Sequence, residues 1–365
     1  MKPTNVIGLR EFVSMGAIIV GLKLTDDTPV VYYKSLANSA WMAPLISGVI
    51  VGVLIYLTMN TLDRYEGQNL IDVIYIGFGK IIGWIVVMYL FISLYLSLII
   101  DSAIYSDLIS TMYFINTPVV AIYGLIVILC SIGAMMGIGA ISSLAWSIIV
   151  YLKFFLFIAL VLAFGHGQTS FIYPLFGYGE WDVIKESISS ISLLDEFFYF
   201  CIFATLLPTK KDFRKGMWIM LIMVTIEITL SMIAFITVFD YKSAQLLNYP
   251  WHEVIRYISL GFIKNVESLF FPFWLIGLII RFSFYFYVTA YLLGRLFKIN
   301  KFQLIVPILA VLTVFIGMIP EQPSFALPEL RKSFINLLSL PTISITILLW
   351  GVVKFKKRRE TKRDN

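Results

Sequence analysis

Hydrophobic residues gather in long runs along this chain, and short polar segments separate the runs. A helix needs about 20 mainly apolar residues to cross the roughly 30 Å hydrocarbon layer of a membrane. We predict a membrane-spanning helix in each run that meets this requirement. The ten runs are 9–32, 41–60, 81–104, 118–137, 141–163, 188–207, 217–239, 268–294, 303–319 and 334–353. The pattern predicts an all-α integral membrane protein with about ten transmembrane helices.

The composition agrees with a membrane protein and excludes several other classes. Of the 365 residues, 59% are hydrophobic and 14% are charged, whereas soluble domains carry about 25% charged residues. Cys130 and Cys201 both lie in apolar runs, which excludes a secreted disulfide scaffold and a CxxC metal site. With two histidines in the chain, we expect neither a metal nor a cofactor.

The distribution of Lys and Arg predicts the orientation, because positively charged loops stay on the cytoplasmic side. With the N-terminus inside, the cytoplasmic segments carry 18 basic residues and the outer segments carry seven. Both termini are therefore expected in the cytoplasm. We divide the chain into a ten-helix membrane domain, 1–353, and a basic cytoplasmic tail, 354–365. The tail marks the cytoplasmic end of a multi-pass protein and does not indicate nucleic-acid binding. We expect no cleavable signal peptide.

The first predicted span is poorly suited to a continuous helix after Gly21. Leu22-Lys23-Leu24-Thr25 follows this glycine, and Asp26, Asp27 and Pro29 come next. Broken helices at membrane depth occur where their free backbone groups line a cavity or are covered by protein, and in transporters they form the substrate site. The alternative is that the span ends at Lys23, whose side chain would then snorkel outward.

A polar stripe runs along the third predicted span. Ser93, Ser97, Asp101 and Tyr105 are spaced four residues apart, so they lie on one face of the helix. We expect this face to point into the protein. The hydroxyl groups alone would also be explained by ordinary helix contacts.

Lys153 lies about twelve residues from the cytoplasmic end of the fifth span, which is about 18 Å and too deep for comfortable snorkelling. It could replace a bound sodium ion or shuttle a proton, because lysine changes its pKa readily when buried. The alternative is a static ion pair with Asp101 or Glu227, of which Glu227 lies near the centre of the seventh span.

The sixth and eighth spans carry further polar residues. The sixth begins with several serines and then Asp195 and Glu196, so an interruption is plausible there. The eighth places Arg281 and Tyr285 in the middle of the membrane. A planar guanidinium suits a carboxylate, which here would belong to a ligand or to Glu227. We favour the internal pair.

Together these motifs resemble the B-subunit (GerAB-like) family of bacterial spore germinant receptors, within the amino acid, polyamine and organocation (APC) superfamily. The resemblance extends from Glu11 to the basic tail. It depends on the order and spacing of several motifs: Gly21-Leu22 followed by Pro29, Leu206-Leu207-Pro208 before Lys210-Lys211, Tyr249-Pro250 through Arg256 to Val266-Glu267-Ser268 and Trp274, and Lys356-Lys357-Arg358-Arg359.

The resemblance implies a LeuT-like fold with two inverted five-helix repeats, in which the first and sixth helices are broken around a small-molecule pocket. Carried over to this chain, the ligand-binding residues would be Gly21, Leu22, Ser97, Asp101, Phe198, Cys201, Arg281 and Tyr285. The family commonly has an acidic residue in the sixth helix shortly before the proline, where this chain has Cys201 or a neighbour. Asp101 or Asp195 could substitute for it in binding a ligand ammonium group.

Three functions remain open at this point. The resemblance implies a subunit that senses a small nutrient germinant, such as an amino acid, in the bacterial cell membrane or spore inner membrane, together with receptor A and C subunits. A proton-coupled amino acid permease, using Lys153 and Glu227 for coupling, needs the same pocket. A membrane-embedded acyltransferase would need a catalytic histidine, but neither His166 nor His252 has a partner at a recognised spacing. We therefore do not expect an enzyme.

The predicted orientation can be tested by cysteine accessibility. Single cysteines introduced at Lys211 and Lys242, in a variant without Cys130 and Cys201, should react with a membrane-impermeant thiol reagent from opposite sides. Position 242 should react in intact cells and position 211 only after permeabilisation. Labelling of position 242 only from the cytoplasm would overturn the topology.

Overall fold

The computed structural model describes residues 7–257, 266–320 and 323–361, and within them the regular structure is helical. The α-helices are α1 Leu9–Gly21, α2 Thr28–Leu36, α3 Met42–Leu62, α4 Leu70–Met112, α5 Val119–Met136, α6 Ile138–His166, α7 Glu180–Ser189, α8 Glu196–Phe200, α9 Lys210–Ala244, α10 Pro250–Tyr257, α11 Val266–Phe297, α12 Val306–Gly317 and α13 Pro323–Thr361. Short 3₁₀ segments join them: η1 Leu22–Thr25, η2 Ala37–Trp41, η3 Thr169–Ile172, η4 Ile191–Leu194, η5 Cys201–Leu206 and η6 Phe302–Ile305.

Seven helices of the described chain are long and apolar enough to cross a membrane, and a bent pair in the sixth predicted span makes eight. The seven are Thr28–Leu62, Leu70–Met112, Val119–Met136, Ile138–His166, Lys210–Ala244, Phe270–Phe297 and Glu329–Lys356. The two other predicted spans correspond to shorter helices. The first is divided between α1 and α2, and the ninth is the apolar segment Phe302–Gly317. An all-helical membrane fold is thus confirmed.

The predicted break of the first span is confirmed. Helix α1 ends at Gly21, the chain continues as the 3₁₀ turn η1, and Asp26 then adopts an extended conformation before α2. The Asp26 side chain accepts a hydrogen bond from the backbone N–H of Thr28 at 2.8 Å, which satisfies one of the free donors at the start of α2. Pro29 fits there because the first turn of a helix does not need its missing N–H.

The sixth span is also broken, as its serines suggested. Helix α7 and the segment Ile191–Leu206 meet at an angle of 53°. At the bend, the backbone N–H of Ser192 donates to Ser339 Oγ at 3.0 Å, and the Ser192 hydroxyl donates to the carbonyl of Ile335 at 2.7 Å. Helix α13 therefore supplies partners for polar groups that the interrupted helix leaves free.

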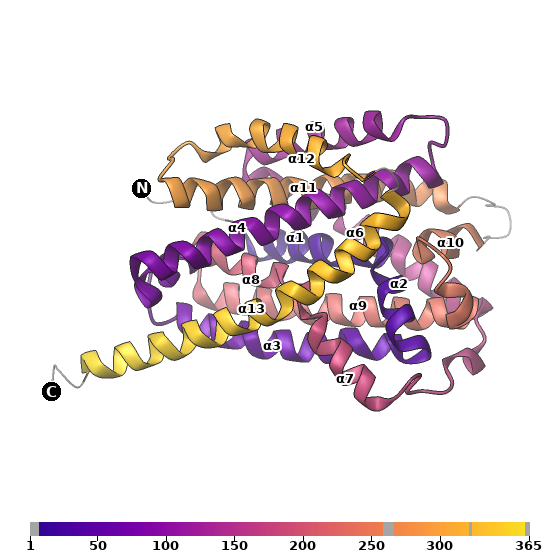
Figure 1. Cartoon of the computed structure of the whole chain (residues 1–365), viewed down its shortest axis with the longest axis horizontal. Coiled ribbons are helices and arrows are strands. Elements are labelled where there is room, and N and C mark those ends of the chain that lie inside the picture. Colours follow the sequence, from indigo (N-terminus) through magenta and orange to yellow (C-terminus); the bar gives the residue numbers. More distant parts are fainter. Residues whose placement is uncertain (1–6, 258–265, 321–322, 362–365) are drawn as a thin grey trace.

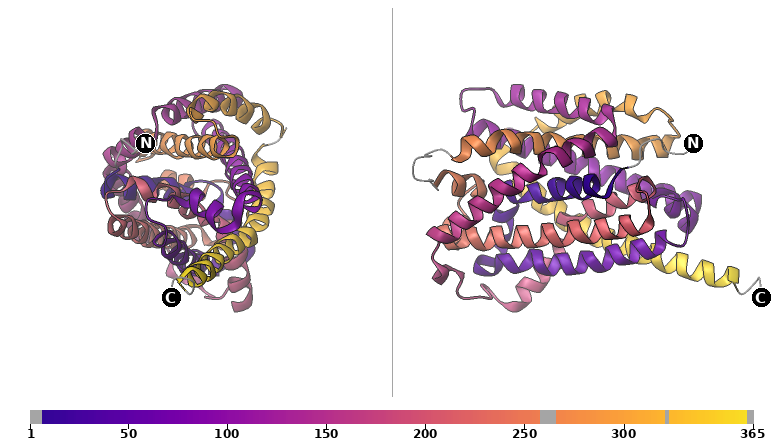
Figure 2. Two further views of the ribbon diagram at one scale, coloured as in Figure 1. Left: turned by 90° about the vertical axis from the view of Figure 1, so that its left-hand side faces the viewer. Right: turned by 180° about the vertical axis from the view of Figure 1, so that it is seen from behind.

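Helix α1 lies inside the bundle, packed against α6, α9 and α11 (Figures 1 and 2). Helices α5 and α12 lie together on one face of the bundle. On another side, α13 crosses diagonally over α4 and α3, and its C-terminal turns project beyond the other helices (Figure 1). The break that follows α1 is consequently surrounded by protein on all sides.

Helix α10 lies at the end of the bundle opposite the C-terminal end of α13 (Figure 1). The sequence predicts a short amphipathic helix in this region, lying at the membrane interface. The helix is present, but its apolar side is buried in protein: Trp251, His252, Val254 and Ile255 are all at most 3% exposed. Helix α10 contacts α9, α11 and η1, and its position at the membrane interface stays a prediction.

Close contact between α5 and α11 depends on Gly133. A Cβ atom at this position would lie 2.3 Å from Ser283 Oγ and 3.1 Å from Ser283 Cβ, so a side chain has no room there. The predicted GxxxG spacing of Gly133 and Gly137 thus contributes to helix packing through its first glycine.

This packing predicts a stability difference between two glycines of α5. Gly133→Leu should destabilise the protein by about 1–3 kcal/mol, because overpacking forces the helices apart. Gly124→Leu is the matched control, since a Cβ there meets nothing within 4 Å. Thermal unfolding of both purified variants in detergent measures the difference, and equal melting temperatures would contradict the close packing of α5 on α11.

Candidate functional site

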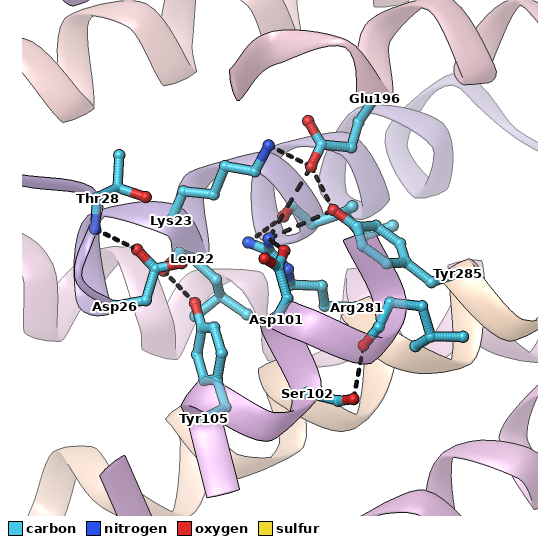
Figure 3. Close-up of polar contacts among 12 residues, drawn as sticks. Leu22, Lys23, Asp26, Thr28, Asp101, Ser102, Tyr105, Glu196, Arg281 and Tyr285 are labelled. Atoms are coloured by element: carbon cyan, nitrogen blue, oxygen red, sulfur yellow. Dashed lines mark hydrogen bonds and ion pairs between the residues drawn. The ribbon is translucent and has the colours of Figure 1, made fainter. Parts of the chain in front are cut away.

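The breaks in the first and sixth spans are joined by a buried ion pair. Lys23 Nζ of η1 lies 2.5 Å from Glu196 Oε1 at the start of α8, and the two side chains are 6% and 1% exposed (Figure 3). Lys23 also donates to the backbone carbonyl of Leu193. Lys23 therefore points into the protein, and the alternative in which it snorkels outward is wrong.

Arg281 of α11 extends this network toward α4 and α1 (Figure 3). Its guanidinium lies 2.6 Å from Asp101 Oδ2 and donates to the carbonyl of Ile19 at 3.1 Å. It also approaches the Tyr285 hydroxyl at 3.3 Å, and that hydroxyl donates to Glu196. The internal pair expected for Arg281 exists, but the predicted partner Glu227 is wrong and Asp101 takes its place.

Aromatic residues hold the η1 turn in position. The Tyr105 hydroxyl donates to the carbonyl of Leu22 at 2.7 Å, and Thr25 Oγ1 donates to the same carbonyl at 2.6 Å. Trp274 Nε1 donates to Thr25 Oγ1 at 3.0 Å, and its ring stacks on Tyr105 with centroids 5.8 Å apart. These contacts satisfy a carbonyl that the helix break would leave without a partner.

Arg331 is a member of the site that the sequence did not reveal. The sequence places it in an outer segment before the last span, whereas the structure buries it on α13 at 3% exposure. It lies 2.9 Å from Asp26, pairs with Asp27, and comes within 3.5 Å of Asp101. Asp26 and Asp27, which follow the break, could have indicated a missing basic partner, because buried carboxylates need a cation nearby.

Acidic side chains outnumber basic ones in this cluster. The acids are Asp26, Asp27, Asp101, Asp195 and Glu196, and the bases are Lys23, Arg281 and Arg331. Some buried polar atoms of the cluster have no hydrogen-bond partner among the described residues: Asp27 Oδ2, Glu196 Oε2 and Arg281 Nε. Such atoms are costly to leave unpaired in a low-dielectric interior.

A cavity of about 20 Å³ lies beside the cluster. It is lined by Ser97, Asp101, Asp195, Tyr285 and Arg331, among others. This volume is about that of one or two water probes. Asp195 makes no ion pair with any described residue, so its carboxylate is available to a group entering this cavity.

Phe198 and Cys201, the sixth-span residues of the predicted pocket, are buried at 7% and 0% exposure. Neither lines this cavity. Cys201 Sγ instead lies 3.6 Å from the carbonyl of Phe197 in its own helix. Gly21, Leu22, Ser97, Asp101, Arg281 and Tyr285 do meet at or beside the two helix breaks, and their role in ligand binding stays a prediction.

Lys153 of α6 pairs with Glu227 of α9 next to the end of α1. The ammonium group lies 2.5 Å and 2.6 Å from the two carboxylate oxygens. A Cβ at Gly21 would lie 3.3 Å from Glu227 Oε1 and 3.5 Å from Lys153 Nζ. These three residues line a second cavity of about 30 Å³. The ion pair is thus present with Glu227 rather than Asp101.

A larger hollow lies on the other side of Asp27. It measures about 460 Å³ and is lined by charged groups that include Asp27, Lys34, Glu329 and Lys332. Arg331, which pairs with Asp27, lines the small inner cavity instead. The Asp27–Arg331 pair consequently separates the outer hollow from the inner cavity.

The two histidines lie in different surroundings. His252 is fully buried on α10, and its Nδ1 lies 2.7 Å from the Tyr113 hydroxyl. Burial, reinforced by the nearby Arg256 charge, lowers the pKa of His252 to about 3, so this ring stays neutral at physiological pH. His166 is exposed and its Nδ1 lies 2.9 Å from the carbonyl of Leu162.

Comparison with solved structures agrees with the architecture. The chain is similar to a structure described as the substrate-bound outward-open state of a Na⁺-coupled sialic acid symporter, with a TM-score of 0.63 and 12% sequence identity. The match covers 94% of this chain and 78% of that chain. At this identity the likeness concerns the fold alone, and the LeuT-like fold expected from the sequence is confirmed in that sense. Comparison with curated proteins finds no matching sequence.

Comparison with protein families identifies the family of the chain. The sequence model of the family described as "Spore germination protein" matches residues 14–326, which include both helix breaks and most of the buried charged cluster. The chain therefore belongs to the spore germination protein family.

Proposed function

We propose that this protein is the germinant-sensing membrane subunit of a spore germination receptor, and that it binds a small nutrient carrying an ammonium group, such as an amino acid. The observation that carries the proposal is the acid-rich buried cluster between the two broken spans. Five carboxyl groups face three cations there. A ligand ammonium group would give a cationic partner to an acid that has none among the described residues.

Asp195 is the best placed carboxylate for the ligand ammonium. It lines the inner cavity, and it has no ion pair within the described part of the chain. Asp101, the other residue expected to substitute for a missing acid, is already engaged by Arg281. A ligand ammonium beside Asp195 would add a charge-assisted hydrogen bond in a water-poor site.

Arg281 could bind the carboxylate of the same ligand. Its Nε is buried without a hydrogen-bond partner among the described residues, while its other nitrogens contact Asp101 and Ile19. Arg281 does not line the inner cavity itself, but it contacts Asp101 and Tyr285, which do, so a zwitterion in an enlarged cavity could reach both Asp195 and Arg281. The inner cavity must expand to admit one, because about 20 Å³ holds only water.

Such an expansion would link binding to a conformational change. A ligand arriving from the outer hollow has to pass the pairs that Arg331 makes with Asp26 and Asp27. Opening these pairs separates α13 from the break after η1. A bound ligand would then shift the balance between closed and open arrangements in proportion to its differential affinity for them.

The receptor setting is inferred from the family. We infer a location in the bacterial cell membrane or spore inner membrane, with both termini in the cytoplasm, and association with receptor A and C subunits. Genome neighbourhood tests this proposal directly. An operon without genes for these two subunits would favour an independent carrier.

A proton-coupled amino acid permease is the second candidate, and the Lys153–Glu227 pair favours it. The pair lies against Gly21 at the first break, and both of its side chains line the cavity of about 30 Å³ there. A membrane-embedded acyltransferase has less support. The hydrogen bonds of the histidines are with the Tyr113 hydroxyl and the Leu162 carbonyl, neither of which forms a Ser/Cys–His or His–carboxylate pair. The family and the fold resemble those of transporters and receptors.

Substitution of Asp195 tests the proposed ammonium site. Asp195→Asn should weaken the response to the nutrient about 10- to 100-fold, because one hydrogen bond to a charged group contributes about 1.5–3 kcal/mol. The concentration giving half-maximal germination of spores that carry the variant measures this effect. Asp182→Asn, at an exposed position of α7, is the matched control. An unchanged response in Asp195→Asn spores would exclude this carboxylate from the site.

Substitutions of Lys153 distinguish sensing from proton-coupled transport. Counterflow uptake of labelled amino acids into liposomes should be absent if the protein only senses its ligand. If Lys153 is a fixed cation, Lys153→Arg should retain part of the germination response and Lys153→Ala should lose it. If Lys153 cycles a proton, both variants should fail, because arginine does not deprotonate. Full activity of Lys153→Ala at normal membrane levels would remove both roles.

A further inference from the structure

A large hollow lies where the predicted third span begins. None of its lining residues belongs to the two helix breaks. The hollow measures about 1070 Å³. It is formed by α4 on both sides of a kink at Gly79, by the last turn of α11 and by the residues that follow α11. Its lining residues are Tyr75, Lys80, Ile81, Trp84, Ile85, Gly294, Arg295, Leu296, Lys298, Ile299 and Asn300. One rim is cationic and one wall is apolar.

The cationic rim has a positive excess. Lys80, Arg295 and Lys298 line the hollow, and the one nearby acid in an ion pair with them is Asp72. Asp72 pairs with Arg295 through Oδ1 and caps the start of α4 through Oδ2, which accepts from the N–H of Asn69 at 3.2 Å. Lys80 and Lys298 are exposed and have no acidic partner among the described residues.

Lys298 occupies a position where glycine is usually favoured. It has φ of 58°, and the N–H of the next residue, Ile299, donates to the carbonyl of Gly294 at 2.8 Å. This is the left-handed cap that commonly ends a helix, and a non-glycine residue in it is strained. The cap fixes the lysine at the rim on a rigid helix end, so its side chain is presented to the hollow at a conformational cost.

The apolar wall is open to the surroundings of the protein. Ile81 is 78% exposed, Ile85 is 56% exposed and Trp84 is 40% exposed. These residues follow Lys80 directly on α4, where the predicted span enters the membrane. Tryptophan is typical of the level of lipid headgroups, and the exposed isoleucines Ile81 and Ile85 before and after it offer an apolar surface to acyl chains.

The basic end of α13 adds to the positive charge of this region. Lys356 Nζ donates to the carbonyl of Ile76, on the turn of α4 next to the hollow, at 2.9 Å. An anionic group in the hollow would therefore have cations on the α4, α11 and α13 sides.

We propose that this hollow binds one anionic phospholipid of the adjacent leaflet, with its phosphate between Lys80, Lys298 and Arg295 and its acyl chains along Ile81 and Ile85. Basic pockets between membrane helices are suited to acidic headgroups. A soluble anion would not explain the exposed apolar wall, and an apolar partner helix would not explain two unpaired lysines. Charge complementarity together with the apolar wall thus favours a lipid.

Native mass spectrometry of the purified full-length protein tests the proposal. With phosphatidylglycerol as the probe, we expect one molecule to bind with at least tenfold higher affinity than phosphatidylcholine. Each lysine near an acidic headgroup contributes about fivefold to affinity, so Lys80→Gln/Lys298→Gln should weaken binding about 25-fold. Lys211→Gln/Lys215→Gln carries the same charge change at two exposed positions of α9 and should retain the site.

A second measurement uses the unmodified protein and does not depend on the folding of a variant. A photoreactive phosphatidylglycerol should crosslink to peptides that contain residues 75–85 or 294–300. Equal affinity for phosphatidylcholine, equal losses in both double variants, or crosslinks confined to other helices would overturn the proposal. So would binding of glycerol phosphate as tightly as the lipid, or a dimer that forms through this face and is lost with Lys80→Gln/Lys298→Gln.

Discussion

The buried ion pair between Lys23 and Glu196 is the interaction on which the centre of the fold depends. Two broken helices meet there, and a break at membrane depth is tolerated only if its free backbone groups find partners. The same side chains that carry charge also satisfy backbone carbonyls: Lys23 donates to Leu193, and Arg281 donates to Ile19. Breaking a buried pair by removing one partner typically destabilises a protein by about 3–5 kcal/mol. The charges therefore stabilise the breaks, and the breaks supply the charges with hydrogen-bond partners.

The proposed ligand site depends on the same arrangement. Five acidic side chains lie there with three basic ones, and Asp195 lines a cavity without an ion pair among the described residues. The inner cavity is separated from the outer hollow by one pair, Asp27–Arg331. Helix α13 carries Arg331 and also supplies hydrogen-bond partners to Ser192 at the bend of the sixth span. Opening the Asp27–Arg331 pair would therefore affect the contacts of both breaks. The proposed ligand at the centre would thereby be coupled to the position of α13.

Much of the fold was predictable because apolar length and polar interruptions are local properties of the sequence. The runs indicated the helices, and Gly21 with the polar residues after it indicated the first break.

The ion-pair partners of the charged side chains were not predictable in the same way. Arg281 had several acids on apolar helices within reach, and only the crossing of α11 over α4 selects Asp101. Phe198 lies in the short helix α8 and Cys201 begins the 3₁₀ segment η5, whose period of three residues per turn differs from that of an α-helix. The face that each residue presents could therefore not be read from the spacing in the sequence. Arg331 was missed because the last apolar run begins after it, although α13 begins at Pro323.

Helices α4 and α11 connect the two sites inferred from the structure. Near their middle they carry Asp101 and Arg281, and at one end they carry Lys80 and Lys298 beside the proposed lipid. The two helices pack along each other, so a lipid held between their ends would restrain that end of the pair. Ligand-driven movement would then be concentrated at the opposite end, where Arg331 meets Asp26 and Asp27. Since a ligand shifts a conformational equilibrium only through its different affinities for the two states, an end fixed by lipid would direct that free energy toward α13 and the outer hollow. A bound membrane lipid would in this way hold one end of the helix pair in place while the proposed nutrient moves the other end.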